Sequence, residues 1–148
     1  MSQKIKNLTA RLSAVQALYQ ASQNKQPLNA LIEEYLEHRV SMEVDGEEVV
    51  QMDGALFKRI VEGVYARSAE LEGVIVQNTK NQAARMESLL KSILLCGIFE
   101  IMAHDEVDSP ILINDYLNIS HSFYGDGEVS LVNGVLDTVA KSFRNSAL

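Results

Sequence analysis

EVSLVNGVLDTVAKSF, residues 128–143, is the stretch that decides the fold of this chain. Its apolar side chains recur at i, i+3, i+4, i+7 and i+11, which places them along one face of a helix. They are Val132, Val135, Leu136, Val139 and Phe143. We therefore predict a helix whose apolar face lies in the core of the protein.

Asn133 and Gly134 interrupt this pattern. An amide close to an apolar face needs a hydrogen-bond partner, and a glycine inside a helix costs roughly 1 kcal/mol relative to alanine. We expect Asn133, and Asn114 further upstream, to be buried and to hydrogen-bond to backbone groups. We expect Gly134 to lie where a neighbouring helix packs closely.

The length and composition are those of a globular protein that needs no crosslink. The 148 residues are 47% hydrophobic, and chains of this length bury roughly 70% of their unfolded surface. No apolar run approaches the roughly 18 residues of a membrane span, and the N-terminus lacks the hydrophobic segment of a signal peptide. The single cysteine, Cys96, excludes an internal disulfide. These features favour a cytosolic protein.

Charge is distributed unevenly along the chain. The formal net charge is −7, yet residues 1–32 carry +4 and contain no acidic residue, while the remainder carries −11. Residues 92–140 contain neither lysine nor arginine. A basic N-terminal segment is able to meet RNA phosphates or an acidic protein surface. The lack of cations over residues 92–140 argues against an extended nucleic-acid face over the C-terminal half.

Helical periodicity accounts for the N-terminal half. Apolar residues at helical spacing predict a first helix over about residues 7–22 and a second over about residues 28–40. Asp53 is a predicted N-cap for a long apolar run that ends at Ile75. That run forms either one bent helix or two helices broken near Ser68.

The segment between the second helix and Asp53 carries a turn signal. Met42 to Gln51 contains Asp45-Gly46, a dipeptide typical of tight turns. A short hairpin is conceivable here. The acidic Glu47 and Glu48 favour an exposed loop instead.

The C-terminal half begins after a polar boundary at residues 78–82. Residues 86–102 are apolar on too many sides for a single stripe, which predicts a central helix that is covered all round. Another helix follows Pro110, and the helix described first completes the chain. The predicted fold is all-α, with a three-helix N-terminal subdomain over about 1–79 and a three- or four-helix C-terminal subdomain over about 80–148.

No arrangement of residues predicts catalysis. His104 to Glu106 is interpreted as a cap or a solvated turn at a helix end. Glu34 and His38 share a helix face, but two ligands do not make a metal site. Cys96 lies among apolar neighbours, where a thiol behaves as a small hydrophobe. We therefore expect a non-enzyme without cofactor or metal.

Three stretches resemble the family of the bacterial transcription antitermination factor NusB. They are AVQALYQ at 14–20, the helix from Pro110 to Phe123 with Ile113-Asn114, and FYG at 123–125 leading to VNGVLD at 132–137. Their order and spacing match the family over nearly the whole chain. The resemblance implies an all-α fold of two helical subdomains. It also implies pairing with the small-subunit ribosomal protein NusE, joint binding of boxA-type leader RNA, and a place in the RNA polymerase antitermination complex of ribosomal RNA transcription.

The RNA-binding residues that the resemblance implies are fewer than is usual. The family places a run of arginines before the apolar stripe of its first helix, where this chain has Asn7-Leu8-Thr9. Lys4, Lys6 and Arg11 remain as the predicted RNA-binding residues.

Partner binding is implied at Tyr19 and Leu131. Tyr19 matches the family pattern, whereas Leu131 stands where an aromatic residue is usual. Without the resemblance, Tyr19 follows the apolar stripe of its helix and is interpreted as a core residue. Asn114, Asn133 and Gly134 carry the structural part of the family signature.

Two functions remain open at this level. One is an RNA-binding adaptor that pairs with NusE. The other is a protein-only interaction module that kept the scaffold but has weak or no RNA binding. The sequence also leaves open whether the free protein is a monomer or a homodimer.

Overall fold

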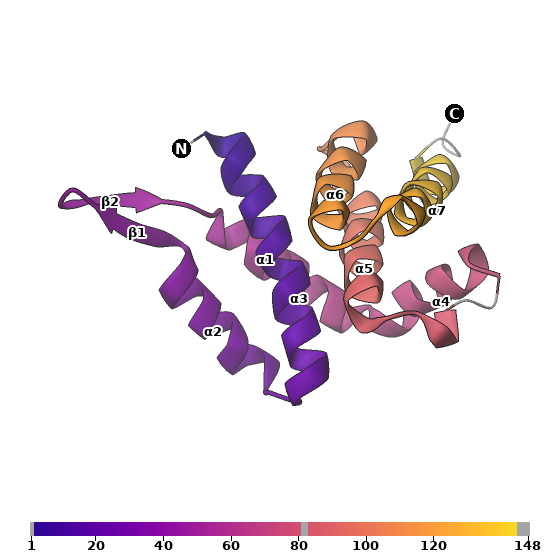
Figure 1. The fold of residues 1–148 in the computed structure, drawn as a ribbon, viewed down its shortest axis with the longest axis horizontal. Helices are drawn as coiled ribbons and strands as arrows, with labels where there is room; N and C mark the ends of the chain where they lie inside the picture. Colours follow the sequence, from indigo (N-terminus) through magenta and orange to yellow (C-terminus); the bar gives the residue numbers. More distant parts are fainter. Residues whose placement is uncertain (1, 81–82, 145–148) are drawn as a thin grey trace. The chain divides into compact units, whose positions relative to one another are not determined.

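Helices account for most of the chain in the computed structural model, which describes residues 2–80 and 83–144. The helices are α1 (Gln3–Asn24), α2 (Leu28–Arg39), α3 (Gly54–Ala66), α4 (Ser68–Asn78), the short 3-10 helix η1 (Ala83–Arg85), α5 (Ser88–Ala103), α6 (Ser109–Phe123) and α7 (Asp126–Arg144) (Figure 1). The strands β1 (Ser41–Val44) and β2 (Glu47–Val50) form a hairpin. The predicted all-α fold is confirmed.

The chain divides into two compact units, residues 1–62 and 63–148, each of which is described by itself. The boundary between them lies within α3, whereas the polar segment at residues 78–82 predicted a boundary near residue 80. The difference arises because α4 contacts α5 and α7 and so belongs to the second unit. A polar segment marks where a helix ends, but it does not show which unit that helix packs against.

The first unit contains α1, α2, the hairpin and the start of α3. The ring of Tyr35 stacks on that of Phe57, with 5.5 Å between ring centroids and 6° between planes. Asp53 caps α3 as predicted, because its Oδ1 accepts a hydrogen bond from the backbone N–H of Leu56 at 3.0 Å. The Gln3 side chain donates to the other carboxylate oxygen of Asp53 at 3.0 Å, which ties the start of α1 to the start of α3.

The segment after α2 is a hairpin, so the prediction of an exposed loop is wrong. Asp45 and Gly46 have φ angles of 51° and 80°, which suit a two-residue turn with both central residues left-handed. β1 pairs antiparallel with β2, and Val44 lies opposite Glu47. The glutamates do not prevent pairing because the hairpin is mostly exposed and they point to water.

The second unit is organised around α5, which contacts α4, α6 and α7. Its residues from Ser92 to Ile101 are buried except for Leu95, as expected of a helix covered on most sides. Gly97 allows α7 to approach, because a Cβ there would lie 2.9 Å from a methyl carbon of Leu136. On α7, the predicted apolar stripe is buried up to Val139, but Phe143 is 46% exposed and lies outside the core.

Asn133 and Gly134 do not have the structural roles predicted for them. Both residues are exposed on α7, and Asn114 is exposed on α6, so the prediction of buried amides is wrong. A Cβ at Gly134 would meet no atom within 4 Å, so the prediction of close packing there is wrong as well. The two residues fall on the solvent side of α7, since the buried stripe occupies the opposite side of the helix.

His104, directly after α5, is buried, although Asp105 and Glu106 that follow it are exposed. Nδ1 of His104 lies 2.8 Å from Oε1 of Glu100, and the hydroxyl of Tyr116 donates to the other oxygen of Glu100 at 2.5 Å. All three residues are buried. His104 is the C-cap of α5, and Asp105 and Glu106 form an exposed turn after it, so the prediction of a cap or solvated turn is confirmed, while the burial of the His104 ring was not predicted.

The guanidinium of Arg144 closes the same end of α5. It donates to the carbonyl oxygens of Ile101 at 3.0 Å, His104 at 2.9 Å and Val107 at 2.5 Å. The last carbonyls of a helix have no partner within the helix, so the end of α7 supplies donors for the end of α5. Within the described residues, no helix is both long and apolar enough to cross a membrane.

Candidate functional site

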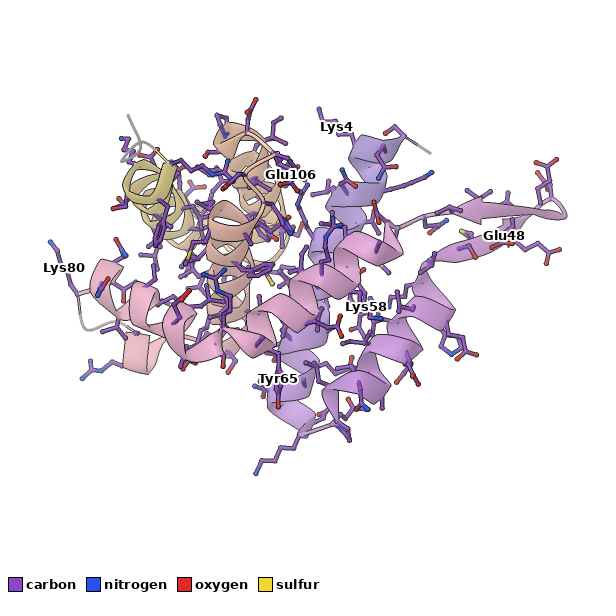
Figure 2. The ribbon with its side chains drawn as sticks, turned by 180° about the vertical axis from the view of Figure 1, so that it is seen from behind. Lys4, Glu48, Lys58, Tyr65, Lys80 and Glu106 are labelled. Carbon is purple, nitrogen blue, oxygen red and sulfur yellow. The ribbon has the colours of Figure 1, made fainter. Side chains whose placement is uncertain are left out.

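The predicted basic residues all lie on α1, but they differ in exposure. Lys4 is exposed near the N-terminal end of α1 (Figure 2), and Lys6 is half-buried. Arg11 is only 2% exposed, so it is not on the surface that an RNA phosphate would meet. The N-terminal half of α1 therefore offers two lysines. Their positive charge at a helix N-terminus opposes the helix dipole, a cost that a bound anion would relieve.

A hollow of about 480 Å³ lies between α1 and α2 in the first unit; we call it the α1–α2 hollow. It is lined by Gln16, Tyr19, Gln20, Gln23, Asn24, Tyr35 and Arg39. Tyr19, a predicted partner-binding residue, is half-buried in this lining rather than enclosed in the core. Aromatic rings, side-chain amides and a guanidinium are the groups that bind single-stranded nucleic acid, by stacking, hydrogen bonding and charge.

Arg39 is held in place at the edge of this hollow. Its guanidinium carbon lies 4.2 Å from the centroid of the Tyr35 ring, and its Nη1 donates to Oε1 of Gln16 at 2.8 Å. The Tyr35 hydroxyl donates to Gln20 at 3.1 Å. Burial raises the pKa of Tyr35, and the neighbouring Arg39 opposes that rise. A guanidinium fixed in this way loses little side-chain entropy when it binds a ligand.

Sequence reasoning missed Arg39. The available signal was the i, i+4 spacing of Tyr35 and Arg39, which places an aromatic ring and a guanidinium on one helix face. The contact with Gln16 of α1 could not be predicted from the sequence, because it depends on how the two helices pack.

A second hollow, of about 660 Å³, lies in the second unit; we call it the α5–α7 hollow. It is lined by Lys80, Arg85, Met86, Glu87, Leu90, Tyr124, Glu128 and Leu131. Leu131, the other predicted partner-binding residue, is half-buried in this lining. Tyr19 and Leu131 thus belong to different units, each with its own hollow.

Tyr124 gives the α5–α7 hollow a polar group. Burial, followed by the nearby carboxylate of Glu87, raises the pKa of Tyr124 to about 12. Its hydroxyl oxygen is buried and makes no hydrogen bond of ordinary geometry within the described chain, although Glu87 is close enough to affect its ionisation. At neutral pH the hollow therefore combines a protonated hydroxyl with apolar side chains and with charges of both signs.

Comparison with known proteins identifies the family of this chain. The model of the NusB family matches residues 8–141. The transcription antitermination protein NusB of Novosphingobium aromaticivorans is 38% identical over 137 residues, which cover 91% of this chain and 93% of that protein. The protein of the same name from Rhizobium rhizogenes is 36% identical over 140 residues, which cover 93% of this chain and 88% of its own.

Solved structures share the fold. A crystal structure of the antitermination factors NusB and NusE in complex with dsRNA aligns with a TM-score of 0.77 at 18% identity, covering 97% of this chain and 100% of that one. T. maritima NusB aligns with a TM-score of 0.74 at 18% identity, covering 90% and 89%. With most of its length matched by the family and by relatives well above 30% identity, this chain belongs to the NusB family.

Proposed function

We propose that this protein is a transcription antitermination factor that pairs with NusE and binds boxA-type leader RNA in ribosomal RNA transcription, as part of an RNA polymerase antitermination complex. Two findings support the proposal. Its relatives carry the name transcription antitermination protein NusB, and a protein of the same fold forms a complex with NusE and dsRNA. A single cysteine supports the reducing cytosol as the place of action.

The observation that carries RNA binding is the presence of both Arg39 and Tyr19 in the lining of the α1–α2 hollow. With Arg11 buried, Lys4 and Lys6 alone would be a weak phosphate site. Arg39 adds a third cation at the C-terminal end of α2, where it contacts Gln16 in the middle of α1. Tyr19 of the same hollow offers an aromatic ring on which a base is able to stack. Lys4 and Tyr19 are 15 residues apart on one helix, which corresponds to about 22 Å along its axis. We infer that a single RNA strand runs along α1 between them.

Three cations predict modest affinity for RNA. If Lys4, Lys6 and Arg39 each neutralise one phosphate, the slope of log K against log salt is about −2 for a single strand. NusE would add its own cations to the surface, and tethering the two sites raises the overall affinity without any new contact on this chain. We therefore propose that the heterodimer is the RNA-binding species.

The α5–α7 hollow is the proposed docking site for NusE. Leu131 and Leu90 supply apolar walls of this hollow. The lining carries Glu87 and Glu128 as well as Lys80 and Arg85, so it favours a partner that presents charges of both signs. A contribution of Tyr19 to partner binding remains part of the proposal, because Tyr19 is partly exposed in the first unit.

Fluorescence anisotropy with a boxA-like RNA, with and without NusE, tests the proposal. Changing Lys4, Lys6 and Arg39 together to alanine should abolish RNA binding by the heterodimer while pairing with NusE is unchanged. The matched control is Lys58→Ala with Arg59→Ala, which removes exposed cations from α3 and should leave RNA binding within about threefold.

Two results would contradict the RNA surface or the function. If the triple variant binds as well as the wild type, the cations on α1 and α2 are not the site. If the wild type does not bind RNA even with NusE present, the protein-only module is the correct function. The burial of Arg11 and the absence of the arginine run are the observations that favour that second function.

A further inference from the structure

The hairpin of residues 41–50 projects from the end of α2, away from the helices of its own unit (Figure 1), and Figure 2 shows Glu48 out on this projection. β1 and β2 pair only with each other among the described residues. Both outer edges of this small sheet are therefore open. A two-stranded hairpin without a third strand or a covering helix is only marginally stable by itself.

The register shows which backbone groups are open. Val44 and Glu47 flank the two-residue turn, and in such a turn this pair exchanges hydrogen bonds. Pairs in an antiparallel ladder alternate between bonded and non-bonded. The next pair, Glu43 and Glu48, therefore directs its N–H and C=O groups away from the partner strand. An additional strand is able to pair with these groups on either edge.

The side chains of the hairpin are acidic and apolar. The segment contains no cation and four carboxylates, namely Glu43, Asp45, Glu47 and Glu48. Its exposed apolar residues are Met42, Val44 and Val50, which are between 41% and 49% exposed. Glu43 lies directly opposite Glu48, an arrangement of like charges that destabilises the pairing. The hairpin contains no cation of its own that would relieve this repulsion, so a cation from a partner would stabilise the pairing.

We propose that this hairpin docks a basic, extended segment of a partner protein, which adds a third strand to one open edge. Main-chain hydrogen bonds would hold the segment in register, its lysines or arginines would neutralise the glutamates, and its apolar residues would cover the exposed methionine and valines. The same charges repel an RNA strand and a second copy of the hairpin, so the pattern selects a basic strand. The hairpin takes no part in the proposed RNA surface or in the α5–α7 hollow.

Nuclear magnetic resonance of the ¹⁵N-labelled full chain tests the docking. The probe is a seven-residue peptide of alternating lysine and valine, and the control peptide alternates glutamate and valine. The lysine peptide should shift amide signals of residues 41–50 and slow the exchange of the outward amide of either Glu43 or Glu48. The glutamate peptide should shift none of them.

A single substitution separates docking from stability. Glu43→Lys places opposite charges across the ladder, so it should stabilise the hairpin. The same change halves the net negative charge of the hairpin, so it should weaken binding of the lysine peptide at least fivefold. Glu43→Lys with Glu48→Lys should abolish binding. The matched control is Glu33→Lys with Glu37→Lys, which makes the same change in charge on the exposed face of α2 and should change the affinity less than twofold.

Three outcomes would overturn the proposal. The first is that the lysine peptide shifts no amide signal of the hairpin. The second is that the α2 control weakens binding as much as the hairpin variant does, which would mean that only overall charge attracts the peptide. The third is that a single-stranded RNA, rather than the peptide, shifts the amide signals of the hairpin. None of these measurements involves boxA-like RNA or NusE, so the hairpin proposal fails or stands independently of the proposed function.

Discussion

Gly63→Ala should destabilise the protein, whereas Gly134→Ala should stabilise it. An alanine Cβ at position 63 would lie 2.1, 2.4 and 2.9 Å from three carbons of the Phe99 ring, while carbon atoms in contact are normally about 3.5–4.0 Å apart. An alanine Cβ at position 134 would meet nothing within 4 Å. The same glycine-to-alanine change is therefore tested at a crowded helix position and at an open one.

The Phe99 ring has little freedom to give way. It is buried, and its edge-to-face contact with His104 has 5.4 Å between centroids. His104 is in turn held by Glu100 at 2.8 Å. Overpacking a core costs about 1–3 kcal/mol, and the overlap here places Gly63→Ala near the upper value. Subtracting the gain of about 1 kcal/mol in helix propensity leaves a loss of about 2 kcal/mol.

Urea denaturation followed by far-UV circular dichroism measures the difference. Gly134→Ala should raise the free energy of unfolding by about 0.5–1 kcal/mol, because an exposed helical glycine gains from alanine. Replacing the Phe99 ring by the smaller leucine side chain in the Gly63→Ala background should recover part of the lost stability. A double-mutant cycle would measure the coupling between positions 63 and 99. If Gly63→Ala is as stable as the wild type, or if Gly134→Ala is destabilised, the packing described here is incorrect.

Two further predictions concern the second unit. Arg144→Ala should lower the free energy of unfolding by about 1.5–3 kcal/mol, because it removes charged donors from the carbonyls at the end of α5; the exposed Lys141→Ala is the control, and equal urea midpoints for the two variants would refute the capping role. Burial, and then the nearby Glu100, raises the pKa of the Cys96 thiol, so a thiol reagent should label Cys96 only in denaturant, and rapid labelling of the native protein at neutral pH would contradict its burial.

Local features of the fold were predictable from the sequence. Apolar residues at helical spacing show where a helix lies and which of its faces is buried, as for the stripe from Val132 to Val139. Asp53 was identified as a cap because a short carboxylate directly before an apolar run suits that position. The all-round apolar composition of α5 indicated a central helix. Each of these depends on neighbours within a few residues in the chain.

The hairpin shows where local signals conflict. Asp45-Gly46 indicates a tight turn, while the flanking glutamates are typical of an exposed loop, and the sequence does not show which signal prevails. The backbone decides it, because left-handed φ angles at Asp45 and Gly46 direct the two strands toward each other. The glutamates then point to water.

The candidate sites depended on tertiary structure. Arg11 and Arg39 are both arginines on helices, yet only the packed structure shows that Arg11 is buried and that Arg39 contacts Gln16 at the rim of a hollow. Gly63 and Gly134 are likewise indistinguishable by local pattern. Only the first faces an aromatic ring from another helix. By itself the sequence determined the family, the helices and their buried faces, because these follow from the order and spacing of residues along the chain. Which side chains meet across helices was decided by tertiary packing, because residues distant in sequence become neighbours only when the helices come together.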